Sequence, residues 1–188
     1  MSDEAPPVPD METPRLRLRR LVLADAPGLH GAYGDAENMR FWDAPPCADL
    51  AETERHIHMS LSFSPAVHAA WAVSRKDDGR FIGMVNYHAR QARNRRLAVG
   101  WILIPAAQGH GWAAEAMMPL LRHCFDTLDT HRIEAEIEPE NTRSEILAAR
   151  LAFRREGLLR DRVRVGDEYR SVMMWSLLRP EWKDWRHA

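Results

Sequence analysis

One stretch of the chain limits the possible folds more than any other: an apolar run, then a proline, two glycines and an amphipathic segment. Residues 99–104 are apolar and rich in β-branched side chains, which predicts a buried strand. Pro105 ends that strand because it has no N–H to give to a neighbouring strand. Residues 113–128 place apolar side chains near a 3.6-residue period, which predicts a helix. The stretch therefore predicts a strand, a glycine turn and a helix, in that order.

The start of such a helix is suited to an anion. About four backbone N–H groups there lack partners within the helix, and the helix dipole adds roughly half a positive charge. Gly109 and Gly111 let the backbone approach a ligand without a Cβ in the way. We therefore expect a phosphate or pyrophosphate, although the same pattern is also compatible with a plain tight turn.

Two common phosphate motifs do not fit this turn. The dinucleotide fingerprint follows the first strand of an alternating βαβ series. The strand before Gly109-His110-Gly111 is not the first strand of such a series. The nucleoside-triphosphate loop needs a Gly-Lys pair, which this sequence does not contain. Neither class of nucleotide-binding fold is therefore expected.

Composition restricts the partners and the compartment. The chain of 188 residues suits a single domain, and its formal net charge of −1 gives no overall basic field to attract nucleic acid or an anionic membrane. No apolar run approaches the roughly 20 residues of a membrane span, and the N-terminus lacks the apolar core of a signal peptide. We expect a cytoplasmic protein with neither a nucleic-acid nor a membrane partner.

The cysteines and histidines predict neither a disulfide framework nor a metal site. Cys47 and Cys124 are the two cysteines, and a reducing compartment fits both. His56 and His58 stand two residues apart on a predicted helix, so their side chains diverge. No set of cysteines, histidines and carboxylates at zinc spacing accompanies them.

Periodicity places the remaining elements. Residues 1–10 hold three prolines among small and acidic side chains, which predicts a disordered lead-in before one domain over residues 11–188. Strands are predicted over residues 15–23, 69–74, 80–88, 97–104, 132–137, 160–165 and 168–177. Helices are predicted over residues 25–33, 49–63, 113–128 and 141–152. Strands before and after two crossover helices give a mixed α/β sheet.

The glycine turn also resembles a known family. Gln108-Gly109-His110-Gly111-Trp112-Ala113 matches [QR]-x-x-G-x-[GA], the acyl-CoA pyrophosphate loop of the GNAT acetyltransferase superfamily. Further matches, in the order seen in its RimJ/RimL branch, are Arg15-Leu16-Arg17-Leu18-Arg19, Phe81-Ile82-Gly83, Val99-Gly100-Trp101, His131-Arg132-Ile133, Asn141-Thr142-Arg143-Ser144 and Glu181-Trp182. The resemblance covers roughly residues 11–182. That branch acetylates protein N-termini and has relatives that use other amines.

The resemblance implies a fold and a donor site. The fold is α/β (α+β mixed): a twisted, mostly antiparallel sheet of about seven strands, flanked by about four helices, whose fourth strand (97–104) splays from the fifth (132–137). In this family the unpaired backbone of the fourth strand binds the pantetheine arm, and the glycine loop holds the pyrophosphate. The implied cofactor-binding residues are Trp101, Ile102, Leu103, Gln108, Gly109, His110, Gly111, Trp112, Ala113 and Asn141. Asn141 is equally well suited to capping a helix.

The resemblance also points to catalytic residues. Ser144 matches the serine proposed to donate to the leaving thiolate; it could instead be an ordinary first-turn residue, with water as the acid. Ala148 stands where many members have a tyrosine acid. Glu136 matches a water-linked glutamate of some N-terminal acetyltransferases, so it is a candidate either to accept the ammonium proton through water or to bind the cation. It shares its strand face with Glu134 and Glu138. The alternative for Glu136 is an ordinary solvent-facing strand residue.

Two further positions bear on the acceptor and on the family pattern. Phe41 and Trp42 are predicted either to line a substrate pocket or to pack helices on the sheet. Leu151-Ala152-Phe153 stands where the family has Leu-Gly-Phe, which puts the turn after the last helix in question.

The resulting prediction is an enzyme: an acetyl-CoA-dependent N-acetyltransferase without a metal. It would transfer acetyl to a primary amine by direct attack on the thioester. The RimJ/RimL resemblance implies a peptide or protein N-terminal α-amine as the acceptor. A small amine stays open as the alternative, because the acceptor loops diverge first in such folds. The oligomeric state is left as monomer or homodimer. The alternative function is a non-catalytic acyl-CoA-binding or regulatory module.

Overall fold

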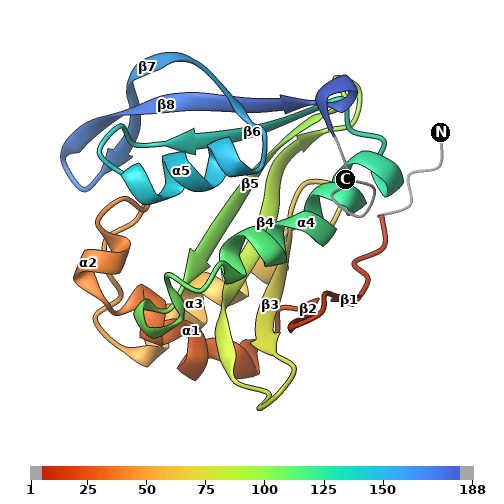
Figure 1. The fold of residues 1–188 in the computed structure, drawn as a ribbon. Helices are drawn as coiled ribbons and strands as arrows, with labels where there is room; N and C mark the ends of the chain where they lie inside the picture. Colours follow the sequence, from red (N-terminus) through yellow and green to blue (C-terminus); the bar gives the residue numbers. More distant parts are fainter. Residues whose placement is uncertain (1–5, 183–188) are drawn as a thin grey trace.

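The computed structural model describes residues 6–182, which form one eight-stranded sheet between two helical layers (Figure 1). The strands follow the spatial order β1-β2-β3-β4-β5-β6-β8-β7. They are β1 (Met11–Glu12), β2 (Leu16–Arg20), β3 (Ala69–Arg75), β4 (Phe81–Gln91), β5 (Arg96–Leu103), β6 (Arg132–Ile137), β7 (Arg154–Val165) and β8 (Glu168–Leu178). The predicted fold class is confirmed, with one more strand than expected.

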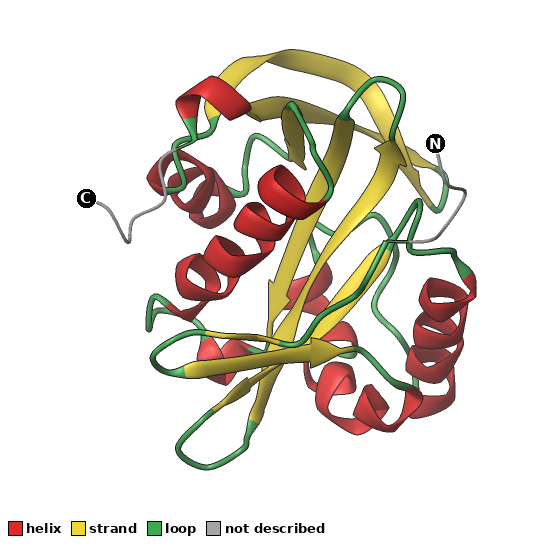
Figure 2. Cartoon of the chain, turned by 90° about the vertical axis from the view of Figure 1, so that its right-hand side faces the viewer, coloured by secondary structure: helices red, strands yellow, loops and turns green. Residues whose placement is uncertain are grey.

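Five α-helices lie in two groups, one on each face of the sheet (Figure 2). They are α1 (Ala26–Tyr33), α2 (Ala36–Met39), α3 (Leu50–Ser62), α4 (Trp112–Arg122) and α5 (Thr142–Arg150). A π-helical turn, His123–Thr127, extends α4. None of these helices, within the part of the chain that the structure describes, is long and apolar enough to cross a membrane.

The core is divided by the sheet. The larger cluster lies on the face covered by α4 and α5 and includes Trp71, Tyr87 and Phe125, all fully buried. The smaller cluster lies under α1 and α3 and includes Leu29 and Ile57. Burial of such large apolar side chains on both faces stabilises the sheet at the centre of the molecule.

The sheet opens between β5 and β6, the only parallel neighbours in the described chain. They pair only at Arg96 with Arg132, Leu97 with Ile133 and Ala98 with Glu134. Beyond these pairs β5 runs on to Leu103 and β6 to Ile137, and the two strands diverge (Figure 1). This is the splay that the family resemblance implies, and it leaves one edge of residues 99–103 without a neighbouring strand.

Three elements differ from the sequence prediction. Strand β1 and helix α2 were not predicted, because two and four residues are too short to show a period. Strand β7 begins at Arg154, whereas the prediction began at residue 160. Its register shifts twice, between Arg155 and Gly157 and between Leu159 and Val163, and these bulges interrupt the alternation that marks a strand.

The predicted lead-in falls partly outside the described residues, since residues 1–5 are not among them. Of the remainder, Val8 packs against the larger core cluster. The carbonyl of Pro9 accepts a hydrogen bond of 2.8 Å from Trp71 Nε1. Residues 8 and 9 therefore lie against the body of the domain.

Candidate active site

The loop between β5 and α4 has the geometry of an anion site. Gly109 and Gly111 have φ values of +83° and +76°, a region that glycine occupies at no steric cost. Trp112 begins α4 directly after them. Within residues 6–182, no group accepts a hydrogen bond from the amides of Gly111, Trp112 and Ala113. These amides, together with the positive end of the α4 dipole, are available to a phosphate.

An arginine from the start of β2 adjoins this loop. Arg15 donates to Glu115 through its backbone amide (2.9 Å) and Nε (2.6 Å), and its Nη2 reaches the His110 carbonyl (3.4 Å). Thr13 Oγ1 also donates to Glu115 (2.6 Å). Burial opposes ionisation of Glu115, but these hydrogen bonds outweigh it and lower its pKa. The carboxylate therefore holds the Arg15 guanidinium beside the loop, with its N–H groups close to the glycine turn.

Gln108 braces the loop. Its Nε2 donates to Asn38 Oδ1 on α2 (2.6 Å), and its Oε1 accepts from Arg143 Nη1 on α5 (2.7 Å). Asn38 in turn donates to the Leu103 carbonyl at the end of β5 (3.1 Å). The Gln108 side chain thus ties elements on both sides of the sheet opening, and its polar atoms are engaged by protein groups.

The free edge of β5 presents peptide groups to the opening. Ile104 donates its amide to the Ile82 carbonyl on β4 (3.0 Å). Since peptide groups along a strand point alternately to its two sides, those of Ile102 face β4, whereas those of Trp101 and Leu103 face the opening. Of the three predicted β5 residues, two therefore have main-chain groups directed at the splay.

Ser144 lies close to this edge, on the first turn of α5. Its hydroxyl accepts a hydrogen bond from Trp101 Nε1 (3.3 Å), and its amide donates to Asn141 Oδ1 (3.2 Å). Asn141 therefore caps α5, which is one of the two roles considered for it. Ala148 is fully buried in the core, at the position where many members have a tyrosine.

The three glutamates of the β6 segment share one face, and each holds an arginine. The alternate residues of β6 are buried in the larger core cluster, so the carboxylates lie on the opposite face. The pairs are Glu134 with Arg132 (2.7 Å), Glu136 with Arg162 (2.9 Å) and Glu138 with Arg170 (3.2 Å). Glu136, the candidate base, therefore has its Oε1 occupied by a guanidinium.

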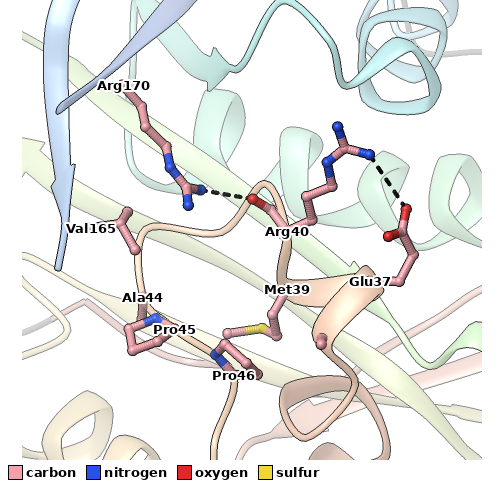
Figure 3. Close-up of a pocket in the computed structure, with 9 residues that line it drawn as sticks. Glu37, Met39, Arg40, Ala44, Pro45, Pro46, Val165 and Arg170 are labelled. Carbon is pink, nitrogen blue, oxygen red and sulfur yellow. Dashed lines mark hydrogen bonds and ion pairs between the residues drawn. The ribbon is translucent and has the colours of Figure 1, made fainter. Parts of the chain in front are cut away.

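Two adjoining hollows lie between the segment around α2 and the β7–β8 hairpin. Their volumes are about 330 Å³ and about 410 Å³, and both are lined by Arg40 and Arg170. Figure 3 shows the first hollow, where Arg170 donates to the Arg40 carbonyl (2.7 Å) and the Arg40 guanidinium lies 3.9 Å from Glu37. Phe41 lines the second hollow. Trp42 packs against Tyr33, with ring centroids 6.0 Å apart.

Residues 15–154 match the family model for the acetyltransferase (GNAT) domain. The chain belongs to the GNAT acetyltransferase family. It is 33% identical over 171 residues to an uncharacterized N-acetyltransferase, p20, of Bacillus licheniformis, covering 90% of this chain and 96% of that relative. It is 30% identical over 107 residues to the ribosomal protein uS5-alanine N-acetyltransferase of Escherichia coli K12, covering 56% of this chain and 55% of that relative.

A solved structure shares the whole fold. It is RimL, described as a ribosomal L7/L12 alpha-N-protein acetyltransferase in complex with coenzyme A, with a TM-score of 0.78 and 21% identity. The match covers 95% of this chain and 99% of RimL. The GNAT domain and the 33%-identical relative make this chain an N-acetyltransferase whose acyl donor is acetyl-CoA.

Within residues 6–182, no cluster of three or more histidine, cysteine, aspartate or glutamate side chains could hold a metal ion. Cys47 and Cys124 are both buried and free.

The residues that sequence reasoning missed make their contacts over long sequence distances. Glu115 binds Arg15 from 100 residues away, and Asn38 binds Gln108 from 70 residues away. Arg15 belongs to a segment that resembles the family, but nothing in the sequence predicts that its guanidinium lies beside the glycine loop. Asn38 gives no periodic or motif signal at all.

Proposed function

We propose that this enzyme acetylates the N-terminal α-amine of a peptide or protein by direct attack of the amine on the acetyl thioester. The observation that carries the proposal is the pair of adjoining hollows sharing Arg40 and Arg170. A small amine needs one compact pocket, whereas a peptide needs room and polar partners beyond its reacting nitrogen. The uS5-alanine N-acetyltransferase supports the same choice, since its name specifies a protein substrate.

The donor is held mainly by backbone groups. The pyrophosphate lies on the amides of residues 109–113, with the Arg15 guanidinium alongside, because this helix start offers free donors. The pantetheine arm bonds to the peptide groups of Trp101 and to the amide of Leu103, whose carbonyl already accepts from Asn38. Asn141 supports the site by fixing the start of α5.

The protein has little covalent work to do, because the thioester is already activated. Holding the two reactants in line supplies much of the rate. Ser144 donates a hydrogen bond to the departing thiolate, and the α5 N-terminus adds favourable potential there.

Thiol release from acetyl-CoA tests the proposal. The acceptors are tetrapeptides that begin with alanine or serine, the same peptides with a blocked N-terminus, and spermidine. We expect release with the free peptides and none with the blocked ones. Release with spermidine alone would identify a small-amine enzyme. Coenzyme A binding by calorimetry without release for any acceptor would instead identify a binding module.

A further inference from the structure

A histidine, His88, lies at the vertex of the sheet opening, on the face that α1 and α3 cover. On β4, Val85 and Tyr87 point into the larger core cluster, so His88 points to the opposite face, which also carries the β6 glutamates. His88 pairs with Ala98, the last β5 residue that still pairs with β6. His88 reaches solvent at one side, although protein groups surround much of its ring, whereas Tyr87 beside it is fully buried.

Asn86 contacts this imidazole at Nδ1. Its side chain lies over Gly100, where an added Cβ would come within 2.9 Å of Asn86 Oδ1. The same oxygen is 3.2 Å from His88 Nδ1. An amide oxygen only accepts, so this contact is a hydrogen bond in the tautomer that has its proton on Nδ1 and leaves the Nε2 lone pair free. Within residues 6–182, no group hydrogen-bonds to Nε2.

Desolvation, and not the surrounding charges, favours the neutral imidazole of His88. Enclosure by neighbouring groups lowers the pKa of His88, while Asp43 from the loop after α2 and Glu136 from β6 oppose that shift. Arg162 occupies the Glu136 carboxylate. His68, before β3, faces His88 too, and burial lowers the pKa of His68 to about 4, so it carries no charge at neutral pH. The Nε2 atom of His88 can therefore accept a proton, whereas each of the three β6 glutamates is paired with an arginine.

We propose that His88 is the general base of acetyl transfer and that Asn86 positions it; this rests on the proposed function above. Nε2 takes one proton from the acceptor ammonium. The neutral nitrogen then forms the C–N bond to the acetyl carbon as the C–S bond breaks. The second amine proton passes to the thiolate, with Ser144 as the relay, and His88 returns its proton to solvent. The net change is one amide, one thiol and one proton released.

The pH profile of kcat/KM for an alanine-initiated tetrapeptide tests His88. The wild type should lose activity on acidification with an apparent pKa below 6.5, as His88 becomes protonated. His88→Gln should lose this acidic limb and about 100-fold or more in kcat/KM, with unchanged coenzyme A affinity by calorimetry. His58→Gln, an exposed histidine on α3, is the matched control and should behave as wild type.

Two further measurements separate catalysis from structure. Asn86→Asp should move the acidic limb up by about one pH unit, because a carboxylate at Nδ1 favours the imidazolium. NMR titration of the histidine rings without acceptor should assign the same pKa to His88. Should His88→Gln misfold by circular dichroism, His88→Ala with added imidazole replaces it, and recovered activity supports the proposal.

The outcomes distinguish the two proposals. A folded His88→Gln that keeps the acidic limb and stays within about threefold of wild-type kcat/KM overturns the role of His88 alone. The same holds for an NMR titration of His88 that does not match the limb. If the wild type binds coenzyme A but acetylates neither peptides nor spermidine, the proposed function is wrong, and so is the proposed role of His88.

Discussion

Ala152 ends α5 in a conformation that glycine holds more easily. Its φ is +66°, and the Phe153 amide closes the helix end by donating to the Ala148 carbonyl (3.0 Å). The family pattern places glycine here, and the alanine was expected to alter the turn. Instead the turn forms with the alanine Cβ in the left-handed region, at a cost of about 1 kcal/mol.

Ala152→Gly is therefore expected to raise the free energy of unfolding by about 1 kcal/mol, measured by urea denaturation. Ala149→Gly is the matched control. Ala149 is exposed within α5, where glycine lowers stability by about 1 kcal/mol. If both substitutions destabilise the protein equally, the left-handed residue is not strained and the explanation is wrong.

At the scale of secondary-structure elements, Gln108 joins α2, α5 and the cofactor loop. Gln108→Ala removes two side-chain hydrogen bonds, to Asn38 and from Arg143. We expect a loss of about 1–2 kcal/mol in stability by urea denaturation. We also expect coenzyme A binding to weaken about fivefold in calorimetry, equivalent to about 1 kcal/mol, because the loop loses its support.

The control for this brace is Gln91→Ala. Gln91 Oε1 also accepts two hydrogen bonds, from Asn94 Nδ2 (2.8 Å) and Arg96 Nε (3.0 Å), at the hairpin between β4 and β5. That hairpin joins the opposite end of β5 from the glycine loop. Gln91→Ala should leave coenzyme A affinity unchanged. An equal loss of affinity in both variants would mean that the effect is general and not due to bracing.

The sequence could predict the features that neighbouring residues determine, but not those that depend on contacts between residues far apart in the chain. Strand β6 has the predicted bounds because Ile133 and Ile137 alternate with glutamates without a break. Strand β7 was predicted six residues short because its bulges break that alternation. The glycine loop was found from local signals, whereas the Asn38 brace and the place of His88 at the vertex depend on strand register and long-range contacts.

At the scale of the whole molecule, the described sheet consists of two half-sheets, β1–β5 and β6–β8, that share only three residue pairs. Glu156 helps to hold the second half-sheet together. On β7, it accepts hydrogen bonds from Arg132 on β6 (2.7 and 2.6 Å) and from Ser176 on β8 (2.6 Å). These contacts, chiefly the hydrogen bonds from Arg132, lower the pKa of Glu156 to about 2.

The stability of the whole domain should therefore depend on pH through this carboxylate. Because its pKa in the folded protein lies below the ordinary glutamate value of 4.5, its contribution to stability is complete above about pH 4.5 and is lost as the pH falls toward 2. The Glu156 side chain is 41% exposed, so solvent screening reduces the contribution to about 1 kcal/mol.

Urea denaturation at pH 6 and pH 3 tests this dependence. The difference in the free energy of unfolding between the two pH values should be smaller for Glu156→Gln than for wild type. Glu54→Gln, on the exposed side of α3, should keep the wild-type difference, and a Glu156→Gln curve parallel to wild type would show that other carboxylates control acid unfolding.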